Sequence, residues 1–291
     1  MKSKKMATCF AILAALLYAI NIPMSKLLLN YVDATMMASF LYLGAGIGLF
    51  IYGVVLKRIN KNKKVDKLTK KELPYTIAMV VLDIIAPILL MFGITMTNSA
   101  NVSLLNNFEI VATSLIALFI FREVISKRLW FAIVLVVIAT IILSFEGTSA
   151  FVFNKGSLLV LGACICWGFE NNCTKMISNK SSVEIVTIKG IFSGLGSFVV
   201  ALLIGETIPS IMFIFLVLLL GFVSYGLSIN LYIKAQSVIG AAKTSAYYSV
   251  SPFCGVLFSL ILLGEVPGIQ FYIALFIMII STIIMVKDTF N

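Results

Sequence analysis

Apolar stretches about as long as a bilayer is thick recur from one end of this sequence to the other. A helix needs roughly 20 consecutive apolar residues to cross the hydrocarbon core of a membrane. Of the 291 residues, 61% are hydrophobic and only 12% are charged. A soluble domain has too little interior to bury so much apolar surface, so the sequence predicts an all-α protein whose solvent is lipid.

Ten apolar ranges, each bounded by charges, turn residues or proline, are predicted to be transmembrane helices. The first follows a basic amino terminus, but it continues to Leu29 without a convincing cleavage site, so it is interpreted as a spanning helix and not as a signal peptide. The ten ranges are 6–29, 34–56, 74–96, 102–121, 129–145, 157–177, 183–204, 211–233, 242–263 and 269–286.

Basic residues are distributed unevenly between the predicted loops. With ten helices both termini lie on one side, and the loops of that side, with 57–72 the largest, carry nearly all the loop lysines and arginines, whereas the opposite loops carry only Lys155. The positive-inside rule therefore predicts a multi-pass protein of the plasma (inner) membrane with both termini in the cytoplasm. Basic loops facing anionic lipid headgroups account for the net charge of +10 without any nucleic acid partner.

The absence of histidine and the positions of the cysteines limit the kinds of functional site that this chain can form. The sequence has no histidine, which removes the commonest metal ligand and the usual general base near neutral pH. All five cysteines lie within apolar ranges, where they are expected to be packing residues, and not a disulfide framework or a zinc cluster. We therefore expect no metal and no cofactor, and histidine-dependent membrane enzymes are excluded.

Short motifs recur in the same order in the two halves of the chain. Five helices are an odd number, so a second copy of a five-helix unit enters the membrane from the opposite side. The sequence thus predicts two inverted five-helix repeats, residues 1–146 and 147–291, an arrangement suited to alternating access. The matching motifs are Tyr18 to Lys26 with Trp167 to Lys175, 99–103 with 241–245, Arg122-Glu-Val with Gly264-Glu-Val, and 139–142 with 281–284.

These motifs resemble those of the EamA-type transporters in the drug/metabolite transporter superfamily. The clearest stretch runs through Gly240-Ala-Ala, Ser251-Pro252 and Gly264-Glu265. The resemblance implies ten helices, a central cavity between the repeats, and transport of metabolites such as amino acids, amines, nucleotide precursors or vitamins. Glu109-Ile110 departs from the family, which often has a proline there, and this argues against a shared hinge in the range 102–121.

Ionisable side chains deep in a bilayer are costly and usually face a cavity or a partner. Glu170, Glu109 and Asp83 are therefore the candidate proton-coupling residues. Asp83 is the weaker candidate, because it lies four residues before Pro87 and a protonated carboxyl there can instead bond a carbonyl that the proline leaves free.

The lysines of the apolar ranges are expected to reach an interface. Lys26, Lys175 and Lys189 are predicted to lie close enough to helix ends for their long side chains to extend to the membrane surface. The sequence therefore predicts that the cavity between the helices is acidic and aromatic.

Polar and aromatic residues at helical spacing form stripes on several of the predicted helices. An alternative for these residues is purely structural, since Ser, Thr and Asn bond across packed membrane helices and Tyr and Trp favour membrane interfaces. The predicted substrate-binding residues are Tyr18, Asn21, Asn106, Glu109, Trp167, Glu170, Asn171, Tyr225, Tyr247, Tyr248 and Ser251.

The leading hypothesis is a secondary transporter. The sequence contains no phosphate-binding Gly-Lys-Ser/Thr loop of the kind that would indicate ATP hydrolysis. A membrane-embedded enzyme and a scaffold or receptor that transports nothing are the alternatives. An acidic, aromatic cavity favours a cationic or zwitterionic amine or amino acid, with exchange against protons as an option. The expected partners are this small molecule, the lipid bilayer and the protons, and the chain is expected to act as a monomer or homodimer.

The topology is testable by labelling single cysteines on a cysteine-free background in intact cells. Lys63→Cys should resist an impermeant maleimide, because its loop is predicted to be cytoplasmic. Ser149→Cys should react, because its loop is predicted to lie outside. Labelling at position 63 but not at 149 would invert the predicted orientation.

Overall fold

The computed structural model describes residues 2–59, 68–120, 122, 126–146, 152–177, 180–239, 244, 247–248, 250–264 and 267–290. These residues form helices and loops, apart from a two-residue antiparallel ladder between β1 (Phe145–Glu146) and β2 (Val152–Phe153). The motif residues Glu123, Gly240 and Glu265 lie outside the described part of the chain.

Helix lies within each of the ten predicted ranges, and several of the ranges are divided into shorter helices. In chain order the elements are α1 (Lys2–Ala19), α2 (Asn21–Leu28), α3 (Ala34–Ile59), the short 3-10 helix η1 (Lys70–Glu72), α4 (Leu73–Met96), α5 (Ser99–Leu105), α6 (Phe108–Phe119), α7 (Lys127–Ser144), α8 (Lys155–Ile177), α9 (Ser182–Leu203), α10 (Ile211–Gly221), the π-helix η2 (Phe222–Leu227), α11 (Ser228–Ile239), α13 (Ser251–Leu263) and α14 (Ile269–Phe290).

Six helical spans in the described residues are long and apolar enough to cross a membrane: 4–28, 34–56, 70–96, 99–119, 182–203 and 211–235. Two shorter apolar helices, Ser251–Leu263 and Ile269–Ile284, follow them. Helix α8 is long enough, but Glu170, Asn171 and Asn172 lower its hydropathy. The chain is therefore a multi-pass helical membrane protein, as the sequence predicted.

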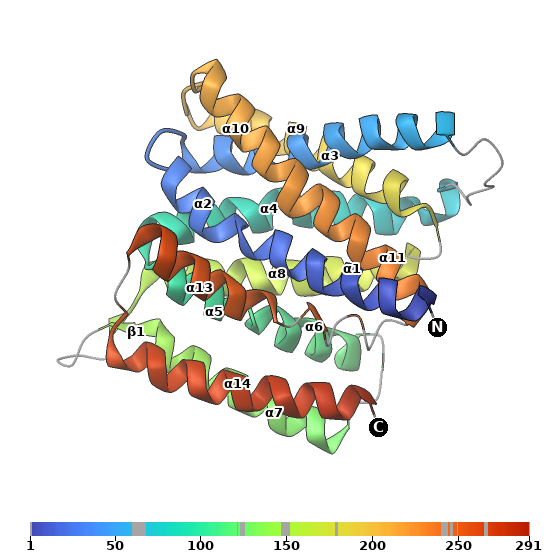
Figure 1. The fold of residues 1–291 in the computed structure, drawn as a ribbon. Helices are drawn as coiled ribbons and strands as arrows, with labels where there is room; N and C mark the ends of the chain where they lie inside the picture. The colour runs from blue at the N-terminus through green and yellow to red at the C-terminus, as the bar shows by residue number, and fades with distance from the viewer. Residues whose placement is uncertain are drawn as a thin grey trace.

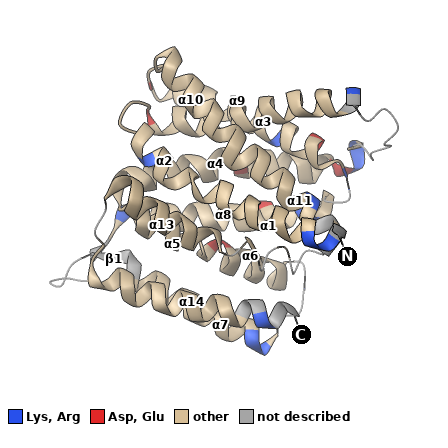
Figure 2. Cartoon of the chain, in the orientation of Figure 1, with Lys and Arg blue, Asp and Glu red and all other residues tan. Residues whose placement is uncertain are grey.

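The helices lie side by side in a bundle, with α3, α9 and α10 at one edge and α7 and α14 at the other (Figure 1). Both ends of the chain lie on the same side of this bundle (Figure 1). Most of the lysine and arginine residues in Figure 2 gather at the helix ends on that side. The distribution of charge along the sequence is thus matched by a distribution in space.

Contacts between helices join the two halves of the chain throughout. Helix α8 packs against α4 and α6 of the first half. Helix α1, its counterpart in the predicted repeat, packs against α11 and α13 of the second half. Helix α3 contacts α10, and α4 contacts α9. Three further pairs, α3 with α9, α5 with α13 and α7 with α14, also join one half to the other. The halves are therefore interleaved, and neither forms a bundle of its own.

Glycine residues bring α3 close to two helices of the second half. A Cβ atom placed on Gly46 would lie 2.5 Å from the backbone nitrogen of Ile191, and one placed on Gly190 would lie 2.3 Å from that of Gly46. A Cβ atom on Gly44 would lie 2.1 Å from the carbonyl oxygen of Leu218. Small residues commonly allow such close approach between membrane helices. Side chains larger than hydrogen are excluded at these contacts.

Two of the predicted spans are interrupted near their middle. The first divides into α1 and α2 at Ile20, just before Pro23. The fourth divides into α5 and α6 at Asn106 and Asn107, although no proline follows Glu109. The backbone changes to i to i+3 hydrogen bonds at this point, from Asn107 to Leu104 and from Glu109 to Asn106. A helix tightens in this way without proline.

The close contact between α3 and α9 predicts a large effect of a side chain at position 46. Gly46→Leu should lower the free energy of unfolding by about 1–3 kcal/mol or more, because the new side chain meets the backbone of α9. Gly162→Ala is the matched control, since its Cβ would meet only the end of the Leu89 side chain at 3.3 Å. Thermal unfolding of the purified variants measures both, and equal midpoints would contradict the close approach.

Candidate functional site

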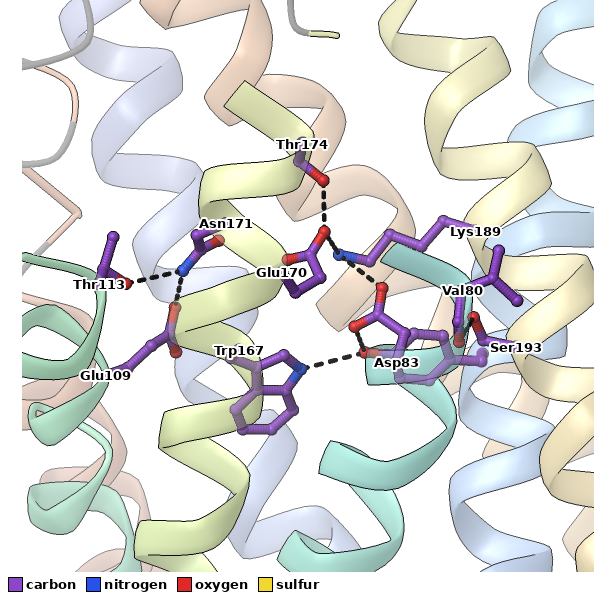
Figure 3. Close-up of polar contacts among 11 residues, drawn as sticks. Val80, Asp83, Glu109, Thr113, Trp167, Glu170, Asn171, Thr174, Lys189 and Ser193 are labelled. Carbon is purple, nitrogen blue, oxygen red and sulfur yellow. Dashed lines mark hydrogen bonds and ion pairs between the residues drawn. The ribbon is translucent and has the colours of Figure 1, made fainter. Parts of the chain in front are cut away.

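A buried ion cluster joins α4, α8 and α9 (Figure 3). Lys189 Nζ lies 3.0 Å from Asp83 Oδ2 and 3.0 Å from Glu170 Oε1. Asp83 is fully buried, Glu170 is 2% exposed and Lys189 is 9% exposed. A buried charge without a partner is very costly, so a cation between two carboxylates offsets part of the cost of burying all three. The cluster contains one more acid than base.

The position of Lys189 corrects the prediction that this lysine reaches a membrane interface. It is the eighth residue of the 22-residue α9, which places it about 10 Å along the helix from its first residue. The side chain turns inward to the carboxylates of two other helices. A charged residue two turns inside an apolar helix was the sequence signal for this role, and the expectation of snorkelling concealed it.

Asp83 is also better supported as a site residue than its sequence context indicated. Its Oδ1 accepts a hydrogen bond from the Tyr42 hydroxyl at 2.9 Å, and its Oδ2 faces Lys189. Both carboxylate oxygens therefore contact other helices, and the proposed repair of the backbone near Pro87 is wrong.

Tyr42 of α3 links the ion cluster to a predicted binding residue. Its hydroxyl donates to Asp83 Oδ1 and accepts a hydrogen bond from Trp167 Nε1 at 3.3 Å. On α8, the Thr174 hydroxyl donates to Glu170 Oε1. Sequence reasoning missed Tyr42, because an aromatic residue in an apolar helix gives no sign of which partner it contacts.

Glu109 forms a second polar group on the other side of α8 (Figure 3). Asn171 Nδ2 donates to Glu109 Oε1 at 2.7 Å and to Thr113 Oγ1 at 3.3 Å. Glu170 and Asn171 are neighbours on α8, so this helix carries the contacts of both acidic groups. Glu109 is paired with an amide, whereas Glu170 is paired with a cation.

A row of tyrosine rings extends from the ion cluster toward α1 and α11. The ring centroids of Tyr42 and Tyr225 are 5.2 Å apart, those of Tyr225 and Tyr18 are 5.8 Å apart, and those of Tyr18 and Tyr248 are 5.7 Å apart. Tyr225 lies in η2, and π-helical turns are frequent at functional sites. Aromatic faces in such a row offer a cation several successive contacts.

A narrow pocket adjoins Tyr18 of this row, between α1, α2, α5 and α13. Ser251 is 2% exposed, and its Oγ has no hydrogen-bond partner among the described residues. Asn106 Oδ1 accepts a long hydrogen bond from Cys164 Sγ at 3.8 Å. The pocket has room for about one water molecule, which can bond the unpartnered buried hydroxyl. The pocket is lined by Tyr18, Ala19, Ile22, Ser103, Asn106, Ser251, Pro252 and Gly255.

The predicted binding residues are placed in three groups. Trp167 and Glu170 belong to the ion cluster, and Glu109 and Asn171 form the amide pair. The remaining residues lie along the tyrosine row and the pocket, apart from Tyr247, which is half-buried. These remaining residues are Tyr18, Asn21, Asn106, Tyr225, Tyr248 and Ser251.

Comparisons with known proteins agree on the class of this chain. The profile of the EamA-like transporter family matches residues 5–145 and 154–287. A curated relative from Methanothermobacter thermautotrophicus, named an uncharacterized transporter, is 27% identical over 271 residues, which are 87% of this chain and 78% of the relative. One solved crystal structure, described only as that of a protein, matches 97% of this chain and 96% of its own, with a TM-score of 0.70 and 12% identity. That likeness concerns the fold alone.

The Tyr42 hydroxyl predicts a stability effect that is independent of transport. Tyr42→Phe should lower the free energy of unfolding by about 1–2 kcal/mol, because it leaves a buried oxygen of Asp83 and the Trp167 nitrogen without a partner. Tyr31→Phe is the control, since Tyr31 is 64% exposed. Denaturant titration of the two variants measures the difference, and an unchanged Tyr42→Phe protein would contradict the hydrogen bonds at this hydroxyl.

Proposed function

The chain belongs to the EamA-like transporter family, and from this premise we propose that it is a secondary transporter of a small cationic or zwitterionic amine or amino acid. It moves this metabolite across the plasma membrane by alternating access. The observation that carries the proposal is the excess of acid among the buried residues. Asp83 and Glu170 share Lys189, and Glu109 lies on the other side of α8, where it is paired with the Asn171 amide.

Two inverted five-helix repeats, residues 1–146 and 147–291, are part of the proposal. The two ranges matched by the family profile divide the chain at nearly the same place. The contacts of α4 with α8 and of α11 with α1 are counterparts under the alignment of the two halves. Arg122 and Gly264, which align, both have a positive φ, 55° and 61° respectively. Such backbone is rare outside glycine, so its recurrence supports a common repeat.

The proposed orientation has ten spans with both termini in the cytoplasm. The two chain ends on one side of the bundle (Figure 1) and the basic residues gathered there (Figure 2) support it. Under this orientation α8 runs from the outside to the inside, so Glu170, seven residues before Ile177 at the end of α8, lies in the cytoplasmic half of the bundle.

The chemistry of the described site favours a substrate with an ammonium group. Carboxylates attract the charge directly, and each tyrosine face adds roughly 0.5–2 kcal/mol when the cation is desolvated. A carboxylate that Lys189 does not neutralise takes up a proton when no substrate is present, because burying it charged is unfavourable. Entry of a cation releases this proton, which couples amine movement to proton exchange.

Flux measurements in proteoliposomes test this function. Glu170→Gln and Glu109→Gln should each lower the flux of amines or amino acids by about tenfold or more, since an amide keeps the volume but loses the charge and the exchangeable proton. Glu184→Gln is the control, because Glu184 lies in the first turn of α9 near the membrane surface.

Folding must be separated from transport in the same variants. Thermal midpoints and size-exclusion profiles should stay close to those of the wild-type protein. Wild-type flux and pH dependence in both Gln variants would remove these carboxylates from the mechanism. A response to organic phosphates or dicarboxylates, with none to amines or amino acids, would show that the proposed substrate charge is wrong.

A further inference from the structure

We propose that Asp83 and Glu170 form a binding site for one primary ammonium group, that Lys189 occupies this site in the absence of substrate, and that a substrate amine replaces it. The proposal rests on the proposed function, since it states how the amine of a transported metabolite is held. It also assigns Lys189 a role, that of an internal occupant of the substrate site.

The geometry of the ion cluster already shows an ammonium bound between the two acids. Nζ of Lys189 lies 3.0 Å from one oxygen of each carboxylate. Yet no well-aligned hydrogen bond reaches Asp83 Oδ2, although this atom is fully buried. A primary ammonium has three donors, and a lysine tethered to α9 is not free to direct all of them. An untethered amine of the same charge is free to turn its N–H donors toward both carboxylates.

Lys189 is the member of the cluster best placed to leave. Its side chain is 11% exposed, compared with 3% for Glu170 and none for Asp83. A lysine side chain is long and has many rotamers, whereas both carboxylates are held by further hydrogen bonds from Tyr42 and Thr174. The acids therefore form a fixed site, and the lysine is its movable occupant.

The matching position in the first half shows that a charged cluster is not required to hold these helices together. Asn21 aligns with Glu170 and Ser25 with Thr174, and the Ser25 hydroxyl donates to Asn21 Oδ1 at 3.3 Å, as Thr174 donates to Glu170. Asn21 Nδ2 then donates to the Tyr225 hydroxyl at 3.2 Å. A neutral pair is sufficient there, so Asp83 and Glu170 serve another purpose.

Exchange of one ammonium for another leaves the charge of the site unchanged. While Lys189 is bound, its Nζ already fills the position between the two acids. Removal of Lys189 without a replacement would leave two buried acids facing each other. Replacement by a substrate amine avoids both situations. The return of Lys189 lets the transporter reorient without substrate, because its two acids again face an ammonium group.

Removal of the internal occupant tests the proposal in purified protein, with methylammonium as the probe. Lys189→Ala leaves the two carboxylates and a space of the size of an alkylammonium ion. Millimolar methylammonium chloride should raise its thermal midpoint, and half of the full shift should occur at a concentration about tenfold or more below that of the wild-type protein, in which a tethered amine competes. Lys189→Ala/Glu170→Gln should not respond, because one acid has been removed.

Controls separate this site from a general effect of salt. Tetramethylammonium has no N–H donors and should shift neither protein, and Lys234→Ala, which removes a lysine that donates to Tyr52, should behave as the wild-type protein does. Equal shifts in Lys189→Ala and the wild-type protein, or equal effects of tetramethylammonium, would overturn the proposal.

A second variant, Lys189→Gln, tests the same site if Lys189→Ala folds poorly. Lys189→Gln fills part of the space and keeps both acids, so methylammonium should stabilise it as well, though at higher concentration than Lys189→Ala. Absence of any response in both variants, including failure to recover either folded when methylammonium is present, contradicts the site.

The result is separable from that of the flux experiment. Binding of methylammonium to Lys189→Ala without amine flux in proteoliposomes would leave the ammonium site standing and overturn the transport function. Amine flux by the wild-type protein, together with unresponsive Lys189 variants, would overturn the ammonium site alone.

Discussion

A charge inside a helix bundle surrounded by lipid has to find its partner within the bundle, and this requirement determines how the centre of the protein is arranged. Lys189 meets it by joining α9 to α4 and α8. Its neighbour Gly190 lets α9 approach α3 so closely that a Cβ atom there would lie 2.6 Å from the Tyr42 carbonyl oxygen. Tyr42 of the same α3 donates its hydroxyl to Asp83 of α4. The helices that pack most closely here therefore also carry the groups that compensate the buried charges.

Features that depend on local composition were predictable from the sequence. Helix lies in every predicted range, because twenty apolar residues in lipid have few ways to satisfy their backbone other than an α-helix. Glu170 lies inside α8 and Glu109 lies in the middle of the span 99–119, as predicted, since position within an apolar run fixes approximate depth. The division at Ile20, three residues before Pro23, also has a local cause, because the effect of a proline on the backbone is local.

Features that depend on which helix faces which were not predictable. The sequence shows that Lys189 is in an apolar helix but not that two acids face it, and it shows Tyr42 as one aromatic residue among many. Both roles follow from the rotation of α3, α4 and α9 about their own axes, which tertiary packing sets. The break at Asn106 was not predictable either, because no proline marks the change to i to i+3 hydrogen bonds there.

Matching positions on α1 and α8 hold their neighbouring helices with different chemistry. In the proposed transport cycle, charge therefore matters at one of these contacts and not at the other. On the side of α1 a neutral contact from Asn21 to Tyr225 holds neighbouring helices together. On the side of α8 the corresponding contact consists of two acids and a cation. Separation of a neutral hydrogen bond needs no ion, whereas separation of Glu170 from Asp83 requires a cation or a proton to move with it. In the proposed transport cycle, conformational change at the α8 contact is therefore tied to what the site has bound, and change at the α1 contact is not.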